Sequence, residues 1–196
     1  MEAPFLTGIV EPSEQYVQQC ARAAAALGGS PPVLRMVDVS PAERVLGGES
    51  IEPLAAATAE LAASLWGQGV RLAFENSRQP VAPLRGLLRR AAELAPDTPP
   101  PQLCWDPHNQ ISQVFDVECP VETARALAPA ELFEIHFKQG SPGLIPQVRE
   151  GVLDWRLILE ALGSCGYRGP ALFELPPGRD IWERLERSRD YILGLL

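Results

Sequence analysis

Short apolar segments alternate along the chain with longer amphipathic segments. The short ones have 5 to 7 residues, are rich in β-branched, aromatic or aliphatic side chains, and are bounded by Gly or Pro, which predicts β-strands. The predicted strands are Phe5–Val10, Val33–Val39, Val70–Glu75, Gln102–Asp106, Leu132–Lys138 and Ala171–Leu175. Apolar positions spaced three or four apart predict helices over Ser13–Leu27, Ser50–Gln68, Val81–Leu94, Val121–Leu127, Trp155–Cys165 and Ile181–Leu195. Asp154 and Asp180 are expected to cap the last two helices.

This alternation of strand and helix has an interval of roughly 30–40 residues, which is typical of βα units that build a parallel sheet. The chain has 20 Pro and 16 Gly, and these residues punctuate the elements rather than gather in a linker. We therefore expect one α/β domain over residues 1–196.

Composition and charge exclude several classes of protein. The net charge is −8 and no cluster of Lys and Arg occurs, which argues against a nucleic-acid partner. No apolar run approaches the ~18 residues of a membrane span, and no leader is recognisable. The four cysteines form no C-x-x-C pair, which indicates a reduced, cytoplasmic protein. The sequence also lacks the G-x-G-x-x-G, P-loop and G-x-S-x-G motifs of nucleotide-binding domains and serine hydrolases.

Four polar residues fall at or near the ends of four consecutive predicted strands: Glu75, Asp106, His136 and Glu174. They are spaced by about one βα unit, so a parallel sheet would bring them to the same carboxyl-terminal edge. The period-2 alternation of strand side chains places all four on the face that carries small or polar residues. A single acidic residue at a strand end is more often a loop cap or an ion-pair partner. Four ligand-type residues at one position in successive units favour a shared site.

Carboxylates that converge on one point repel one another unless a cation lies between them. Mg²⁺, Mn²⁺ and Co²⁺ accept carboxylate and imidazole ligands and leave coordination positions open for substrate oxygens. Such a metal polarises a carbonyl, and two carboxylates can then move a proton as general acid and base through an enediolate. The residues therefore indicate isomerisation or epimerisation of a sugar.

Several motifs resemble the xylose isomerase-like TIM barrel superfamily, the sugar phosphate isomerase/epimerase family. They are Val70–Asn76, Leu103–Asn109, Glu134–Lys138, the segment from Gly151 to Trp155, and Phe173–Leu175. The resemblance implies that Glu75 and Glu174 are both metal ligands and the catalytic acid/base pair. It makes Asp106 and His136 the remaining ligands of a divalent metal (Mn, Mg, Co or Zn). Asn76, His108, Asn109 and Lys138 are then expected to bind substrate, and Gln139 stands where the family usually has Asp.

A (β/α)8 TIM barrel typically needs ~250 residues. The resemblance aligns the six predicted strands with strands 3–8 of such a barrel, so for 196 residues we expect an N-terminally truncated, incomplete barrel. Its open strand edge would be covered in a homodimer. The expected function is that of a metal-dependent isomerase or epimerase, or a dehydratase-like lyase, acting on a small carbohydrate or hydroxy-carbonyl substrate. The alternative is a catalytically impaired homologue that binds a small molecule or serves as a partner subunit.

Overall fold

The computed structural model describes residues 15–29, 31–37, 51–77, 79–112, 119–140 and 145–196. The chain divides into two compact units, Met1–Cys104 and Trp105–Leu196, here called the N-terminal and C-terminal units. The organisation as one domain stays a prediction. The predicted strand Phe5–Val10 lies outside the described residues.

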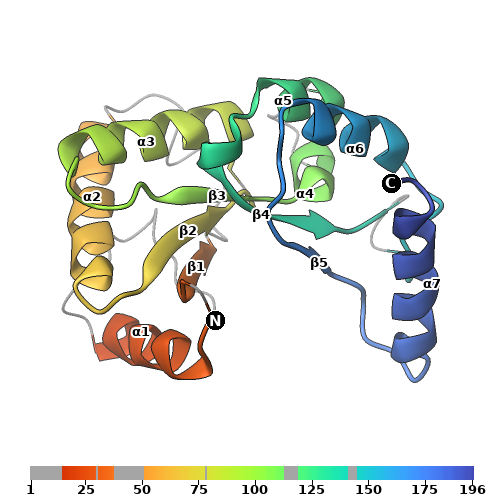
Figure 1. The fold of residues 1–196 in the computed structure, drawn as a ribbon, viewed down its shortest axis with the longest axis horizontal. Helices are drawn as coiled ribbons and strands as arrows, with labels where there is room; N and C mark the ends of the chain where they lie inside the picture. Colours follow the sequence, from red (N-terminus) through yellow and green to blue (C-terminus); the bar gives the residue numbers. More distant parts are fainter. Residues whose placement is uncertain (1–14, 30, 38–50, 78, 113–118, 141–144) are drawn as a thin grey trace. The chain divides into compact units, whose positions relative to one another are not determined.

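The N-terminal unit contains three parallel strands and three helices (Figure 1). The strands are β1 (Val33–Val37), β2 (Arg71–Glu75) and β3 (Gln102–Trp105), whose last residue begins the C-terminal unit. The helices are α1 (Gln15–Leu27), α2 (Glu52–Trp66) and α3 (Val81–Leu94). The strands lie in the order β1-β2-β3, and Glu75 pairs in register with Val37 on one side and Cys104 on the other.

Helix α2 shows how the sequence forms these elements. Small and aliphatic residues recur on one face, so Ala55, Ala59, Leu61, Ala62 and Leu65 are buried. The helix ends in a turn in which Val70 N donates to Leu65 O at 3.0 Å, and Gly69 there has φ +73°. Glycine adopts this conformation without steric cost, so it turns the chain directly from α2 into β2.

The C-terminal unit contains two parallel strands, β4 (Leu132–Phe137) and β5 (Ala171–Phe173). Its helices are α4 (Pro107–Ser112), α5 (Pro120–Ala126), the 3-10 turn η2 (Pro129–Glu131), α6 (Trp155–Ser164) and α7 (Ile181–Leu193). Figure 1 shows β4 and β5 side by side, with α5 next to α6. The ring of Phe137 packs between Trp155 and Phe173, at centroid distances of 4.9 and 5.1 Å. These aromatic contacts join α6 to both strands.

The structure confirms five of the predicted strands, four of them nearly to their bounds. The last is shorter than predicted: β5 ends at Phe173, so Glu174 lies one residue beyond the strand. Pro176 and Pro177 follow closely and lack the N–H that a strand ladder needs, which explains this early end. Helix α4 was not predicted, because six residues are too few to show a helical period.

The two predicted helix caps differ in outcome. Asp154 caps α6, since its side chain accepts a hydrogen bond from Leu157 N at 3.2 Å. The prediction for Asp180 is wrong, because its side chain makes no cap hydrogen bond. Arg184, one turn along α7, binds the Asp180 carboxylate instead, with an Nε–Oδ2 distance of 2.9 Å. The guanidinium thus takes the acceptor that the helix N–H groups would otherwise use.

Candidate metal centre in the C-terminal unit

Asp106 links β3 to α4 and is fully buried. Its Oδ1 accepts a hydrogen bond from Asn109 N at 2.9 Å, which is the geometry of a helix N-cap and fixes the carboxylate. Its Oδ2 lies 3.1 Å from Lys138 Nζ and 3.9 Å from His136 Nδ1. One oxygen therefore holds the carboxylate in place while the other faces the neighbouring side chains.

His136 lies near the end of β4 and is fully buried. Its Nδ1 lies 3.1 Å from Glu174 Oε2, and its Nε2 lies 3.5 Å from Glu134 Oε1. Strand geometry explains the second contact, because residues two apart in a strand point to the same face. The imidazole therefore has a carboxylate at each of its ring nitrogens.

Glu174 follows β5 and remains aligned with β4, since its backbone N donates to Phe137 O at 3.1 Å. Its side chain is 41% exposed, and Lys138 Nζ donates a hydrogen bond to its Oε1 at 2.7 Å. Lys138 also donates to Asn109 Oδ1 at 3.2 Å. The ammonium of Lys138 thus joins the residues after β3 to the residue after β5.

These contacts shift two ionisation equilibria. The hydrogen bond from His136, assisted by Lys138, lowers the pKa of Glu174 to about 2, although partial burial opposes the shift. Burial alone would lower the pKa of Lys138, but the charges of Asp106 and Glu174 outweigh it and raise that pKa. At neutral pH Glu174 is consequently a carboxylate and Lys138 an ammonium.

Three of the predicted ligands come together in this unit. Asp106, His136 and Glu174 each offer an oxygen or nitrogen atom, and these atoms lie within 4.8 Å of one another. Carboxylate and imidazole donors suit Mg²⁺, Mn²⁺, Co²⁺ and Zn²⁺, so the donor set fits the predicted divalent metal. The C-terminal unit therefore contains a cluster that could hold a metal ion.

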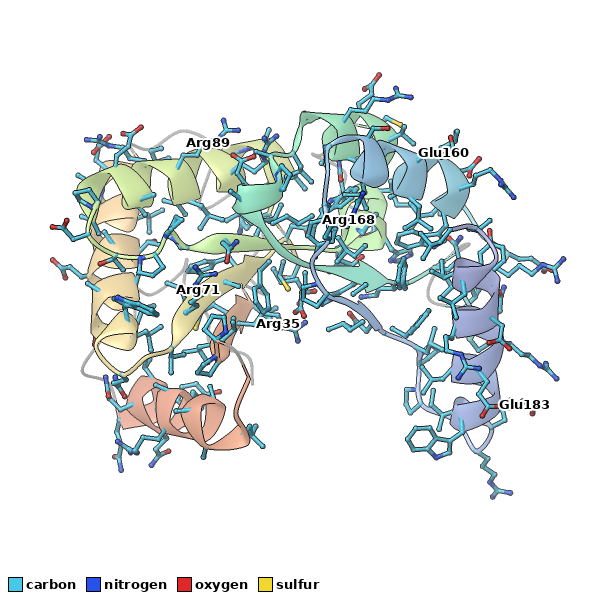
Figure 2. The ribbon with its side chains drawn as sticks, in the orientation of Figure 1. Arg35, Arg71, Arg89, Glu160, Arg168 and Glu183 are labelled. Carbon is cyan, nitrogen blue, oxygen red and sulfur yellow. The ribbon has the colours of Figure 1, made fainter. Side chains whose placement is uncertain are left out.

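Glu75 and Asn76 belong to the N-terminal unit and are described there on their own. Glu75 is the last residue of β2 and forms an ion pair of 3.0 Å with Arg35 of β1, whose position Figure 2 labels. Asn76 is buried, and its N donates to Cys104 O at 3.4 Å. The roles of Glu75 as ligand and acid/base group, and of Asn76 at the substrate, stay predictions.

The other predicted substrate-binding residues lie beside the cluster. The side chain of Asn109 binds Lys138, as described above. His108 is half-buried on α4, and burial lowers its pKa despite the nearby charge of Asp106. A neutral imidazole is therefore expected there at pH 7. A role of these residues in substrate binding stays a prediction.

Sequence reasoning missed two features of this region. The Glu134–Lys138 motif gives Glu134 no role, yet the carboxylate of Glu134 faces the second ring nitrogen of His136. The i, i+2 spacing of Glu134 and His136 was a signal that could have revealed this contact. The second feature is the burial of Lys138. This residue is the single lysine among the chain's 17 basic residues, and its side chain is buried beside the cluster.

No family model matches the chain, and neither does any curated protein. Several solved structures are similar. A xylose isomerase-like TIM barrel/4-hydroxyphenylpyruvate dioxygenase fusion protein is 17% identical with a TM-score of 0.69, covering 92% of this chain and 30% of that one. A D-allulose 3-epimerase from Methylomonas sp. is 18% identical with a TM-score of 0.67, covering 94% of this chain and 73% of that one.

A xylose isomerase-like TIM barrel protein from Mycobacterium smegmatis, in complex with magnesium, is 16% identical with a TM-score of 0.63. That match covers 89% of this chain and 63% of that chain. The chain thus spans less than a third of the fusion protein and roughly two thirds of the other two. Within the described residues, no helix has the length and apolar character needed to cross a membrane. The chain has the α/β fold of xylose isomerase-like TIM barrel proteins, and its described residues supply five strands of such a barrel.

Proposed function

We propose that this chain is a divalent-metal-dependent enzyme of the sugar isomerase or epimerase type. The observation that carries the proposal is the convergence of Asp106, His136 and Glu174, whose ligand atoms lie within 4.8 Å of one another. The substrate would be a small carbohydrate, sugar phosphate or other hydroxy-carbonyl compound. The reaction would move a proton next to the carbonyl through an enediolate.

Each residue of the cluster has a defined task in this proposal. Asp106, His136 and Glu174 would hold the metal, and Glu174 would also exchange a proton with the substrate. When bound, the metal would supply Lewis-acid polarisation of the substrate carbonyl. A carboxylate with a pKa of about 2 is a weak base, so Glu174 must first give up its hydrogen bonds to Lys138 and His136. Lys138 would then be available to bind an anionic group of the substrate.

Glu75 is proposed as the fourth ligand and as the second member of the acid/base pair. This assignment rests on the resemblance of Val70–Asn76 to the family and on the place of Glu75 at the end of a buried strand. Moving a proton between two faces of a carbon requires two groups, of which Glu174 supplies one. The substitution Glu75→Gln should abolish proton exchange and weaken metal binding.

Metal content tests the proposal directly. The protein is stripped of metal with a chelator, reloaded with Mn²⁺ or Co²⁺ and desalted. The metal bound per protein chain is then measured by elemental mass spectrometry. We expect one equivalent in the wild type, loss of metal in Glu174→Gln and retention in Glu160→Gln. Glu160 is a suitable control because it is exposed on α6, where Figure 2 labels it. A wild type that holds no metal after reloading would contradict the proposal.

The reaction is tested by exchange with solvent. Ketoses, sugar phosphates and hydroxypyruvate are incubated with the loaded protein in D₂O, and deuterium beside the carbonyl is measured by NMR. Metal-dependent uptake in at least one substrate is expected. Uptake that persists in both Glu75→Gln and Glu174→Gln would refute the roles given to the two glutamates.

One observation favours a second function, that of a catalytically impaired homologue. Lys138 already places a positive charge 2.7 Å from Glu174 and 3.1 Å from Asp106, which neutralises part of the cluster without any metal. Such a protein would bind a small molecule or a partner and catalyse nothing. A wild type that takes up no metal, while a Lys138→Met variant does, would support this second function.

Homodimer formation belongs to the proposal as well. β5 stands at the end of the strand order, and an apolar groove of ≈ 620 Å³ lies along β4, β5, α6 and α7. Exposed strand edges tend to pair with another chain. Sedimentation of the protein as a monomer at micromolar concentration would contradict the proposed homodimer.

The expected cytoplasmic location is a separate proposal, and cell fractionation tests it.

A further inference from the structure

Glu134 and His136 form a pair within β4. Their side chains share one face of the strand, and Glu134 Oε1 lies 3.5 Å from His136 Nε2. Glu134 is largely buried, with a side-chain exposure of 15%, and His136 is fully buried. A carboxylate so placed has a specific partner, and the proposed reaction gives it no direct task.

The two nitrogens of an imidazole constrain each other. A neutral ring carries one proton, so it can offer a lone pair to a metal from one nitrogen only if the other holds the proton. Here Nδ1 is the nitrogen that faces Glu174 and Asp106, at 3.1 and 3.9 Å. For Nδ1 to serve as a ligand, the proton must therefore reside on Nε2, opposite Glu134.

We propose that Glu134 is a positioning residue that holds the Nε2–H of His136 and thereby directs the Nδ1 lone pair toward Asp106 and Glu174. This inference rests on the proposed function, because it assigns His136 as a ligand. Metal-binding histidines commonly donate their second N–H to a carboxylate, which fixes the tautomer and the ring orientation. The distance of 3.5 Å exceeds that of a normal hydrogen bond, so we expect it to shorten when Nδ1 binds a cation.

The opposite tautomer is disfavoured by the same carboxylate. If Nδ1 carried the only proton and donated it to Glu174, the lone pair of Nε2 would face the negative charge of Glu134. Glu134 thus favours a ring that keeps its Nε2 proton, so that only the Nδ1 proton facing Glu174 has to leave when Nδ1 binds a metal. This is why we assign Glu134 a role in positioning rather than in packing alone.

NMR of the metal-free protein tests the tautomer without recourse to activity. The chain has only two histidines, His108 and His136, so a ¹⁵N-histidine label gives two rings, and a His108→Gln variant assigns them. We expect a protonated Nε2 on His136 in the wild type and in Glu134→Gln, whose amide oxygen still accepts. In Glu134→Ala that proton should be lost from Nε2 or exchange rapidly. An unprotonated Nε2 in the wild type would overturn the inference.

Metal affinity supplies the second readout. Titration of the stripped protein with Mn²⁺ should show binding about 10- to 100-fold weaker in Glu134→Ala than in the wild type. Glu134→Gln should lose only a few-fold, because it keeps the acceptor. Glu160→Gln removes the same charge from an exposed position and should leave the affinity unchanged.

The two experiments separate failure of this inference from failure of the proposed function. If the wild type binds Mn²⁺ and Glu134→Ala binds it equally well, the positioning role is refuted and the metal site stands. If the wild type binds no metal but its Nε2 is protonated in a manner that depends on Glu134, the proposed function fails while the tautomer assignment stands.

Discussion

Replacing Lys138 by methionine gives a variant with two opposite expected effects. The methionine keeps an unbranched apolar stem and removes the ammonium that contacts Asp106 and Glu174. Without that charge the two carboxylates repel each other, so the metal-free variant should be less stable than the wild type. A divalent metal should bind the variant more tightly, because no lysine contact has to be broken first.

The size of the effect follows from the two contacts. Nζ lies 2.7 Å from Glu174 Oε1 and 3.1 Å from Asp106 Oδ2. Hydrogen bonds to charged groups contribute about 1.5–3 kcal/mol each, but the Glu174 side chain is 41% exposed, so solvent weakens its share. Giving up both contacts should cost about 2 kcal/mol, which corresponds to metal binding tighter by roughly 10- to 30-fold.

Calorimetric titration with Mn²⁺ and thermal unfolding with and without the metal measure both effects. The Lys138→Met variant should start from a lower Tm and gain more from the metal, since a ligand stabilises the folded state by RT ln(1 + [L]/Kd), which grows as Kd falls. Arg156→Met is the matched control, because it removes one positive charge from an exposed position of α6. Because Lys138 is the only lysine, a ¹⁵N-lysine label gives one ammonium signal, which should shift when the metal binds to the wild type. Metal binding that is weaker or unchanged in Lys138→Met would refute the reasoning.

Three further predictions concern the same unit. Asp106→Asn removes a charged ligand and should weaken Mn²⁺ binding at least 10-fold by titration, whereas equal affinity would remove Asp106 from the ligand set. The folded-state pKa of Glu174, about 2, lies below its usual 4.5, so its contribution to stability is present above pH 4.5 and is lost as the pH falls toward 2. Unfolding by urea should therefore depend less on pH over that range in Glu174→Gln; an identical pH dependence would contradict the shift. Gly151 has φ +151°, and a Cβ there would collide with the Gln139 side chain, so Gly151→Ala should lower the free energy of unfolding by about 1–3 kcal/mol. A denaturation midpoint equal to that of the wild type would contradict this prediction, because it would show that the backbone at Gly151 and the Gln139 side chain can shift to accommodate the added methyl group.

Much of the fold could be predicted because most of its strands and helices can be recognised from the residues within each element and directly beside it. The strands carry apolar and β-branched residues between glycines and prolines, and helices such as α3 show a clear period, so Val81–Leu94 was predicted to the residue. Short elements gave weaker signals. Helix α4 has a cap at Asp106 and a proline at its first position, but its six residues hold no repeat.

The site was predictable in its residue types and less so in its contacts. That Asp106, His136 and Glu174 lie close together could be predicted, because strand ends recur at one interval along the chain. The contact between Nδ1 of His136 and Glu174 joins a residue of β4 to the residue that follows β5, and its geometry depends on packing that no local pattern encodes. The pKa of Glu174 could not be predicted for the same reason, since it depends on hydrogen bonds from His136 and Lys138.

Gln139 has a consequence for residues 145–153, which follow β4 in the described part of the chain. Its amide is fully buried; Nε2 donates to Leu153 O at 2.9 Å, and Oε1 accepts from Leu153 N at 3.0 Å. An aspartate, which is usual here in the family that the sequence resembles, carries a charge and has no proton to donate to a carbonyl when ionised. A neutral amide holds this segment in the same way whatever charge the neighbouring carboxylates and imidazole carry. Trypsin should therefore cleave after the exposed Arg149 at one rate in the metal-free and metal-loaded protein, so that order in this segment and occupancy of the site are independent properties.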